Sequence, residues 1–401
     1  MVTRRDFIKG MCGAAALAST VSFYPSLAFA NVRTDKRLVV VLLRGGMDGM
    51  AALAPYGDKN YQSLRGDLSL NKDVLLRVDP FFGLHPSLEP LANLYKKGEM
   101  ICIPASALPY RERSHFDAQN MLELGSLKPH GLKSGWLNRF VDIINGDDNM
   151  ALAFGQGMPT IMRGHASVNS WAPSVLPDVG DDYLSLIQKV YANDKLFSQN
   201  FARAMDIQDM AMDAVGGNER KMTRKSRSPQ AFVTMAGAAG QWLAKPEGPR
   251  IATLELGGWD THVGQGTEGG RLANNLSLFA RGIGEMKQGM GSLAWSKTVV
   301  IALTEFGRTA RPNGNRGTDH GTASTAFLFG GALKGGRMVH KWPGLGDADL
   351  YEGRDLRPTI DVNAIVKGVL HEHYGISQRT LSRDIYPNSQ NSGLIKGLVR
   401  A

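Results

Sequence analysis

Acidic and imidazole side chains follow several apolar runs of this sequence at the point where each run ends. The clearest case is LELGGWDTH at 254–262, where Asp260 and His262 follow a strand-like segment and two glycines. Similar positions, after or near an apolar run, are taken by Asp48, Glu305, Asp319 and His320. The carboxyl ends of strands in an open parallel sheet meet at one edge, so these groups are predicted to share a cleft.

Carboxylates and imidazoles gathered in one cleft repel each other, or shift their pKa values, unless a cation lies among them. Mixed Asp, Glu and His donors suit zinc, manganese and related divalent ions. Taken alone, a strand-end aspartate is more often a helix cap, and a lone histidine is more often structural. The recurrence of acidic and imidazole side chains at one predicted sheet edge favours a metal site. Its predicted ligands are Asp48, Asp260, His262, Glu305 and His320.

Ser114 is open to three interpretations. The stretch RSHFDAQNMLELG predicts a helix that begins near Ser114 and ends at Gly125. The serine either caps this helix, with Asp117 three residues later, or offers a nucleophilic hydroxyl at a helix N-terminus that binds anions. A ligand of a metal or substrate is the third reading. Arg111 and Arg113 beside it are candidate clamps for the anion.

The elements that must position these residues are predicted from apolar patterning. Four continuous apolar runs, at 38–43, 99–108, 250–256 and 297–307, are typical of strands buried on both faces. A helical pattern at 269–290 separates the last two, and a further strand and turn follow at 324–336. Such strand–helix–strand units predict an α/β fold with a doubly wound, mostly parallel central sheet and helices on both faces.

Residues 1–30 are predicted to be a twin-arginine signal peptide. TRRDFIK at 3–9 precedes a short apolar run and AFA at 28–30, a small-x-small cleavage site. A retained membrane anchor is the alternative, although the apolar part is short and interrupted by Ser, Thr and Pro. Residues 31–401 are then expected to form one domain, with a helical insertion at about 175–248 and no membrane span.

The composition, 43% hydrophobic and 21% charged over 401 residues, is that of a globular protein with a sizeable core. The net charge of +9 raises the question of nucleic acid as a partner, but export argues against it. The densest basic run, at 220–227, is interpreted as a solvated loop. Cys102, the one cysteine left after signal removal, lies in an apolar strand and is predicted to be a buried structural thiol.

Six motifs behind the twin-arginine signal resemble a bacterial family catalogued as a domain of unknown function, number 1501. In chain order they are LVVVLLRGGMDGMAALAPYGD, GLHP, RSHFDAQ, LELGGWDTH, TEFGRT and GTDHG. The resemblance covers nearly the whole chain after the signal. That family looks like a remote member of the alkaline phosphatase and sulfatase superfamily, which are metal-dependent hydrolases of phosphate and sulfate esters with a doubly wound α/β fold.

The resemblance implies roles for individual residues. Asp48 matches the metal-binding Asp after the superfamily's first strand, and Ser114 lies where the nucleophile would begin its helix. Asp260 and His262 resemble the ligands of an outer metal, although only Thr261 separates them where the superfamily commonly has a wider spacing.

The later motifs match the superfamily in part. Glu305 takes the place of the next metal-binding Asp, and His320 resembles the last His ligand, with Asp319 beside it. Phe306 stands where the phosphatases have a histidine, so one metal would lose a ligand. The resemblance is therefore equally compatible with a pair of zinc ions, with a single metal ion and with an ion other than zinc.

These features predict an exported, metal-dependent hydrolase of phosphate or sulfate esters. One or two divalent ions (zinc, manganese, magnesium or calcium) would polarise the ester. Ser114 would attack, and His115 or Asp319 would move a proton. The candidate anion contacts are Arg111, Arg113 and Arg308. The expected partners are an anionic ester or anionic glycan as substrate and the twin-arginine translocase for export.

Two alternatives remain at this point. The first is a non-catalytic exported scaffold that binds a polymer or a partner protein, which Phe306 and the close spacing of Asp260 and His262 favour. The second is an exported transferase that moves a phosphate-linked group onto a surface glycan.

Overall fold

The computed structural model describes residues 34–144, 150–155, 157–172, 181–202, 204–205 and 230–400. The predicted signal at 1–30 and the basic run at 220–227 lie outside these residues. Among the residues described, no helix has both the length and the apolar character that crossing a membrane requires.

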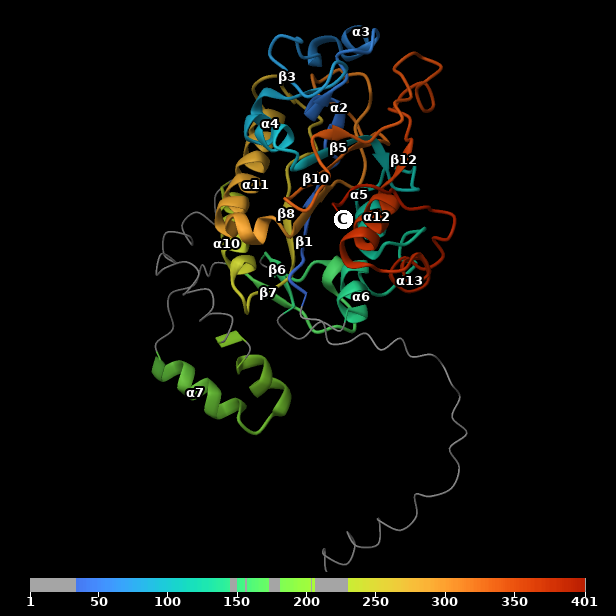
Figure 1. The fold of residues 1–401 in the computed structure, drawn as a ribbon. Coiled ribbons are helices and arrows are strands. Elements are labelled where there is room, and N and C mark those ends of the chain that lie inside the picture. Colours follow the sequence, from blue (N-terminus) through green and yellow to red (C-terminus); the bar gives the residue numbers. More distant parts are fainter. Residues whose placement is uncertain are drawn as a thin grey trace, which may run out of the picture. The chain divides into compact units, whose positions relative to one another are not determined.

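A central sheet organises this part of the chain (Figure 1). Its strands lie in the order β11-β5-β10-β9-β1-β8-β6-β7, and β12 also pairs with β5. Their bounds are β1 (Arg37–Leu43), β5 (Met100–Ala107), β6 (Ala151–Phe154), β7 (Asn169–Trp171), β8 (Ile251–Leu256), β9 (Thr298–Leu303), β10 (Ser324–Phe329), β11 (Arg337–Met338) and β12 (Ile360–Asp361).

Most strand pairs are parallel. β1 pairs in parallel with β8 and β9, and β6 pairs in parallel with β7 and β8. β10 is antiparallel to both of its neighbours, β5 and β9. The predicted α/β fold with a mostly parallel sheet is confirmed, whereas β6, β7 and the reversed direction of β10 go beyond the prediction.

Helices cover both faces of the sheet, as predicted. One face carries α4 (Glu89–Lys96), α10 (Ala231–Ala244) and α11 (Arg271–Trp295), and the other carries α5 (His115–Leu124), α6 (Trp136–Ile143) and α12 (Val362–Tyr374). β1 contributes to both cores because successive side chains of a strand point to opposite faces. Val39 and Val41 belong to the first core, and Leu38 and Val40 belong to the second.

Shorter elements complete the described chain. A small sheet in the order β2-β4-β3 comprises β2 (Leu53–Ala54), β3 (Leu76–Arg77) and β4 (Gly83–Leu84). The remaining helices are α2 (Gly49–Ala52), α3 (Tyr61–Arg65), α7 (Asp181–Tyr191) and α13 (Gln378–Thr380), with short 3₁₀ or π turns at η2 (Gly66–Leu68), η3 (Pro86–Leu88), η4 (Thr160–Met162) and η5 (Leu381–Ile385).

The segment predicted as a helical insertion contains helices at both of its ends. α7 lies near its start, and residues 206–229 in its middle lie outside the described residues. α10, near its end, packs on α11 and buries Phe232 and Trp242 in the first core. α10 is therefore a core helix of the sheet layer.

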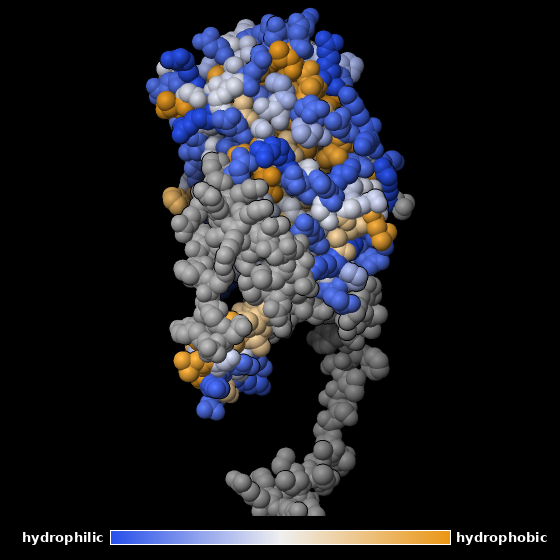
Figure 2. All heavy atoms as spheres, turned by 90° about the vertical axis from the view of Figure 1, so that its left-hand side faces the viewer, coloured by the Kyte–Doolittle hydropathy of each residue, from blue (hydrophilic) through white to orange (hydrophobic). Residues whose placement is uncertain are grey.

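The surface on the side of α4, α10 and α11 is mostly hydrophilic where described residues form it (Figure 2). Hydrophobic residues are scattered among the polar ones on this view. Hydrophobic residues exposed in this scattered way are normal for a folded domain and call for no binding partner.

Cys102 lies in β5, and its side chain is fully buried. Burial raises the pKa of its thiol, because the thiolate loses its hydration in an apolar core. The predicted buried structural thiol is confirmed.

His373 of α12 is expected to make the free energy of unfolding vary with pH. Its ring is buried, and Nε2–H donates to the carbonyl of Arg37 at 3.2 Å. Burial lowers the pKa of His373 to about 4, from 6.5 in the unfolded chain. Between these values only the unfolded chain takes up the proton, so stability is lost as the pH falls from about 6.5 towards 4.

We expect His373→Gln to reduce this loss by up to about 3 kcal/mol. The measurement is urea unfolding at neutral pH and again just above pH 4. His165→Gln, at an exposed position, is the control. If both variants keep the wild-type pH dependence, the burial argument for His373 is wrong.

Candidate metal centre

The candidate site forms at the sheet edge where the parallel strands end. β5, β9, β1 and β8 all point the same way, since β10 is antiparallel to both of its neighbours. Asp260 and His262 follow β8, and His115 begins α5 after β5. His320 reaches the same edge from the opposite direction, because β10 runs back and begins there at Ser324.

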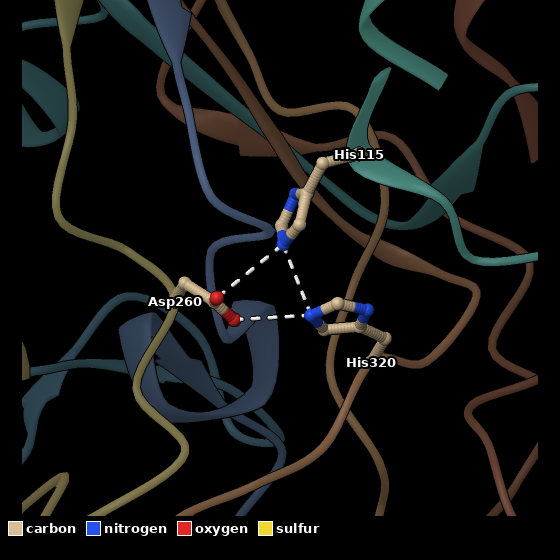
Figure 3. A group of neighbouring side chains, drawn as sticks. All are labelled: His115, Asp260 and His320. Carbon is tan, nitrogen blue, oxygen red and sulfur yellow. Dashed lines mark hydrogen bonds and ion pairs between the residues drawn. The ribbon is translucent and has the colours of Figure 1, made fainter. Parts of the chain in front are cut away.

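Three of these side chains meet around one point (Figure 3). His320 Nε2 lies 3.1 Å from Asp260 Oδ1 and 3.0 Å from His115 Nε2. His115 Nε2 lies 3.5 Å from Asp260 Oδ2. Since the three ligand atoms all lie within 4.8 Å of one another, His115, Asp260 and His320 form a group that could hold a metal ion.

His262 adds a fourth donor to this group. Its Nε2 lies 3.0 Å from His320 Nε2 and 3.0 Å from Asp260 Oδ1. Ligand atoms that surround a tetrahedral zinc ion at 2.0–2.1 Å are about 3.4 Å from one another. The contacts of 3.0 to 3.5 Å within the group of His115, Asp260 and His320 are close to that spacing, so these three donors fit one divalent ion. His262 contacts His320 and Asp260 from one side of the group.

The second ring nitrogen of each histidine is bound to an oxygen. Nδ1 of His115 lies 2.8 Å from Glu305 Oε1, and Nδ1 of His262 lies 2.9 Å from Asp319 Oδ1. Nδ1 of His320 lies 2.9 Å from the carbonyl of Arg113. Histidines that bind metals usually donate their other N–H to a carboxylate or a carbonyl, which fixes the ring and its tautomer.

This arrangement leaves unprotonated Nε2 atoms facing each other. The carbonyl of Arg113 can only accept, so Nδ1 of His320 carries the proton and its neutral ring has a lone pair at Nε2. That lone pair faces the Nε2 atoms of His115 and His262 and an oxygen of Asp260. One added proton could bridge only one of these three contacts, whereas a cation would satisfy all of them.

The lowered pKa values of His320 and Asp260 favour metal binding, whereas the raised pKa of His115 favours its protonated form and opposes it. Burial lowers the pKa of His320, which keeps its imidazole in the neutral form that binds metals. Burial acts to raise the pKa of Asp260, but the hydrogen bond and charge of Arg308 and the charges of His262 and His115 together outweigh it, so the pKa is lowered. The hydrogen bond to Glu305 raises the pKa of His115.

Glu305 lies behind His115 and is not among the four donors. It is buried, and its Oε1 accepts from Gly45 N at 2.8 Å and from Gln119 Nε2 at 2.9 Å, besides His115. Thr304 donates to its other oxygen at 3.1 Å. These hydrogen bonds lower the pKa of Glu305 despite its burial. Glu305 therefore holds His115 in place as an ionised acceptor.

Gly45 shows why the first strand ends in two glycines. Its φ of 122° belongs to the left-handed region that favours glycine. A Cβ atom there would also lie 2.7 Å from the backbone nitrogen of Asp260. The glycine thus lets the chain after β1 lie against the loop that carries Asp260 and donate to Glu305.

Asp48 lies outside the donor group. It is buried, caps α2 by accepting from Ala51 N at 3.2 Å, and forms an ion pair of 2.5 Å with the buried Arg65. Gln265 donates to the same carboxylate at 2.8 Å. These three interactions occupy most of the acceptor positions of the Asp48 carboxylate. Asp48 therefore holds the surrounding loops together.

The three arginines predicted to bind an anion are all engaged with the protein. Arg308 is buried and donates to Asp260 Oδ1 at 2.5 Å and to Thr318 Oγ1 at 3.1 Å. Arg113 donates to Asp355 at 3.0 Å and pairs with Glu352 at 2.6 Å. Arg111 donates to the carbonyls of Leu108 and Tyr110, each at 2.6 Å.

Ser114 is placed as the N-cap of α5. Its hydroxyl accepts from Asp117 N at 3.5 Å. Phe306, in the position where the resembled superfamily has a histidine, packs its ring 4.7 Å from that of His115 and 5.0 Å from that of His320. The aromatic ring thus closes one side of the donor group with an apolar surface.

Gln119 is a residue that the sequence reasoning missed. It lies four residues after His115, on the same side of α5, and donates to the carboxylate that orients His115. Its Oε1 accepts from Arg44 Nη1 at 3.0 Å. The signal available in the sequence was the i, i+4 spacing within the motif RSHFDAQ.

We expect Asp48→Ala to lower the free energy of unfolding by about 3–5 kcal/mol, because it leaves the charge of Arg65 buried and unpaired. Metal content should stay at the wild-type value. Denaturant unfolding and elemental analysis check both points, with the exposed Asp347→Asn as the control. Loss of metal at wild-type stability would mean that Asp48 is a ligand after all.

We expect Glu305→Gln to weaken metal binding about 10–100-fold, since orienting carboxylates have effects of this size. Competition with a chelator of known affinity measures the change. Glu352→Gln, at an exposed carboxylate, should bind metal like the wild type. Unchanged metal affinity in Glu305→Gln would show that the contact with His115 has no role in binding.

Solved structures of low similarity were found. Ps i-CgsB in complex with k-i-k-neocarrahexaose has 10% identity and a TM-score of 0.39, with 90% of this chain and 77% of that chain covered. The C-terminal periplasmic domain of EcEptC from Escherichia coli, in complex with Zn, has 8% identity and a TM-score of 0.35, covering 74% and 73%. The phosphonate monoester hydrolase of Agrobacterium radiobacter has 8% identity and a TM-score of 0.34, covering 84% and 74%.

Identities and TM-scores this low support no inference about activity. A comparison with curated proteins gave no match. A family model does match, over residues 85–385, a range that includes His115, Asp260, His262 and His320. The chain therefore belongs to the family described as Protein of unknown function (DUF1501).

Proposed function

We propose that the protein is a metal-dependent hydrolase of phosphate or sulfate esters, with one divalent ion held by His115, Asp260, His262 and His320. The observation that carries this proposal is the meeting of three imidazole Nε2 atoms and one carboxylate, with every Nδ1 bound to an oxygen. A bound ion at such a site supplies a Lewis acid and lowers the pKa of water.

The site is open enough for substrate and water. The side chains of Asp260 and His262 are 43% and 40% exposed, whereas Glu305 and Arg308 beneath them are buried. Donors at the surface and orienting groups below them are the arrangement expected of a site that binds a ligand from solvent. Arg308 keeps Asp260 ionised and in place.

Water is the nucleophile that this geometry favours. The hydroxyl of Ser114 caps its own helix and contacts Tyr110, and no contact with a histidine or carboxylate that could take its proton was found in the described residues. Asp319, half-exposed beside His262, is placed to accept a proton at the rim of the site. Its hydrogen bond from Asn313 lowers its pKa, so it is a carboxylate at neutral pH.

An anionic ester is proposed as the substrate because the positive charge of the bound ion is the main feature of the site that could distinguish between substrates. Arg111, Arg113 and Arg308 are held by protein acceptors, so the cation itself would be the chief attraction for a phosphate or sulfate group. Export as a folded protein by the twin-arginine translocase, from the motif at 3–9, is part of the proposal and would permit metal loading before export.

The test combines metal analysis with turnover of p-nitrophenyl phosphate and p-nitrophenyl sulfate. The purified chain should contain a divalent metal and hydrolyse at least one of these esters. His262→Ala should lose both metal and turnover, because it removes one donor. Ser114→Ala should keep most of the turnover, and the exposed His165→Ala should keep all of it. Turnover that persists without metal would refute the proposal.

A second candidate is a non-catalytic exported scaffold that uses the metal for structure. The observation in its favour is that His262 lies beside the group of His115, Asp260 and His320, so the chain offers four side-chain donors, the number found in closed structural zinc sites. Cobalt substitution separates the two functions. An open site changes its visible spectrum when azide or phosphate is added, whereas a closed site does not.

A further inference from the structure

A second cavity, of about 550 Å³, lies beside the residues that orient His115. We call it the Arg44 cavity, and the residues that give it its chemistry are Arg44, Gln119, Glu123, Arg163, Thr253 and Glu255. Its volume falls within the range of about 300–1,000 Å³ that is typical of small-molecule sites. None of these residues belongs to the four metal donors.

The sheet itself explains why this space is open. Thr253 and Glu255 lie two residues apart in β8, so their side chains share one face. The residue paired with Thr253 on β6 is Ala153, whose methyl group fills little volume. Gly157, further along, has no atom near the position of a Cβ. The small side chain of Ala153 and the glycine at 157 therefore leave space beside Thr253.

The polar groups of the cavity are held in fixed positions. Arg44 Nη2 contacts Glu123 Oε1 at 2.9 Å and Glu255 Oε1 at 2.5 Å, and Nη1 donates to Gln119 at 3.0 Å. Glu123 is buried, and its second oxygen accepts from the backbone of Ile161 at 3.0 Å. The cavity thus has carboxylate and amide groups whose orientation is set before any ligand arrives.

Thr253 brings a hydroxyl to the cavity. The residue is 1% exposed, but its hydroxyl is not among the fully buried side-chain groups that lack a hydrogen-bond partner, so it keeps contact with the space of the cavity. This hydroxyl lines the cavity and is therefore available to a ligand there.

The formal charges of the cavity lining sum to zero, so they favour neither an anion nor a cation as the occupant. Arg44 is neutralised by Glu123 and Glu255, and Arg163 at the rim balances the remaining negative charge. The cavity therefore presents hydrogen-bond acceptors and donors in fixed positions, and its lining carries no net charge. Several hydroxyl groups on a compact ring satisfy such a set, since each hydroxyl both donates and accepts.

We propose that the Arg44 cavity binds a neutral saccharide unit, with Thr253, Glu255 and Gln119 as its hydrogen-bonding contacts. Gln119 also donates to Glu305, so an occupant of the cavity would share a side chain with the network that holds His115. The binding itself does not depend on the proposed hydrolysis, and it is measured with and without metal.

The experiment measures binding of D-glucose, D-galactose, N-acetylglucosamine, lactose and cellobiose to the full chain by calorimetry and ligand-observed NMR. At least one of these should bind, and chelation of metal should leave binding in place. Thr253→Val should weaken binding about tenfold, the effect of losing one hydrogen bond of about 1.4 kcal/mol. It preserves volume and removes no protein contact, so the variant should fold like the wild type.

Glu255→Gln is the second variant, and it should weaken binding at least as much because a carboxylate is a stronger acceptor. Asp142→Asn, an exposed carboxylate outside the cavity, is the matched control and should bind like the wild type. Absence of binding by all five saccharides overturns the proposal. So does binding that Thr253→Val and Glu255→Gln leave unchanged, or binding of inorganic phosphate or spermidine at the cavity instead.

Discussion

The candidate site depends on one electrostatic constraint, because His320 Nε2 has more nitrogen and oxygen neighbours than a single proton can bridge. The lone pair of His320 Nε2 meets two other imidazole nitrogens and an oxygen of Asp260, all within about 3 Å. Rotation of the rings would move these atoms apart, but each Nδ1 is bound to Glu305, Asp319 or the carbonyl of Arg113. The protein therefore holds these groups close together in a geometry that one added proton would satisfy only in part and that a bound cation would satisfy.

The sheet and its loops are arranged to keep that geometry. Parallel strands bring the segments after β5, β8 and β9 to one edge, and the reversed β10 adds His320 from the other direction. Beneath the donors, the buried Glu305 and Arg308 hold His115 and Asp260. The glycine at 45 lets the first strand's loop approach closely enough to donate to Glu305. Gly45 donates to Glu305, and the buried Glu305 and Arg308 in turn hold His115 and Asp260 in place.

The same layer links the metal centre to the Arg44 cavity. Gln119 accepts from Arg44 on one side and donates to Glu305 on the other. Through this amide, a change in the cavity would alter the hydrogen bonding of the carboxylate that orients His115. A connection of this kind suits a protein that recognises one part of a substrate in the cavity and another at the ion, because the two parts would be sensed by one network.

The sequence by itself determined the α/β fold, the buried strands and the gathering of Asp260, His262 and His320, because apolar periodicity and strand-end positions are local properties. Tertiary structure alone decided which polar residues meet in the candidate donor group. Asp48 and Glu305 follow strand ends, as Asp260 does. Asp48, however, forms an ion pair with Arg65, and Glu305 accepts a hydrogen bond from His115. Arg113 and Arg308 likewise have partners distant in the chain, whereas Arg111 donates to the nearby carbonyls of Leu108 and Tyr110. Burial and long-range pairing decide these roles, and neither is encoded in the spacing of one segment.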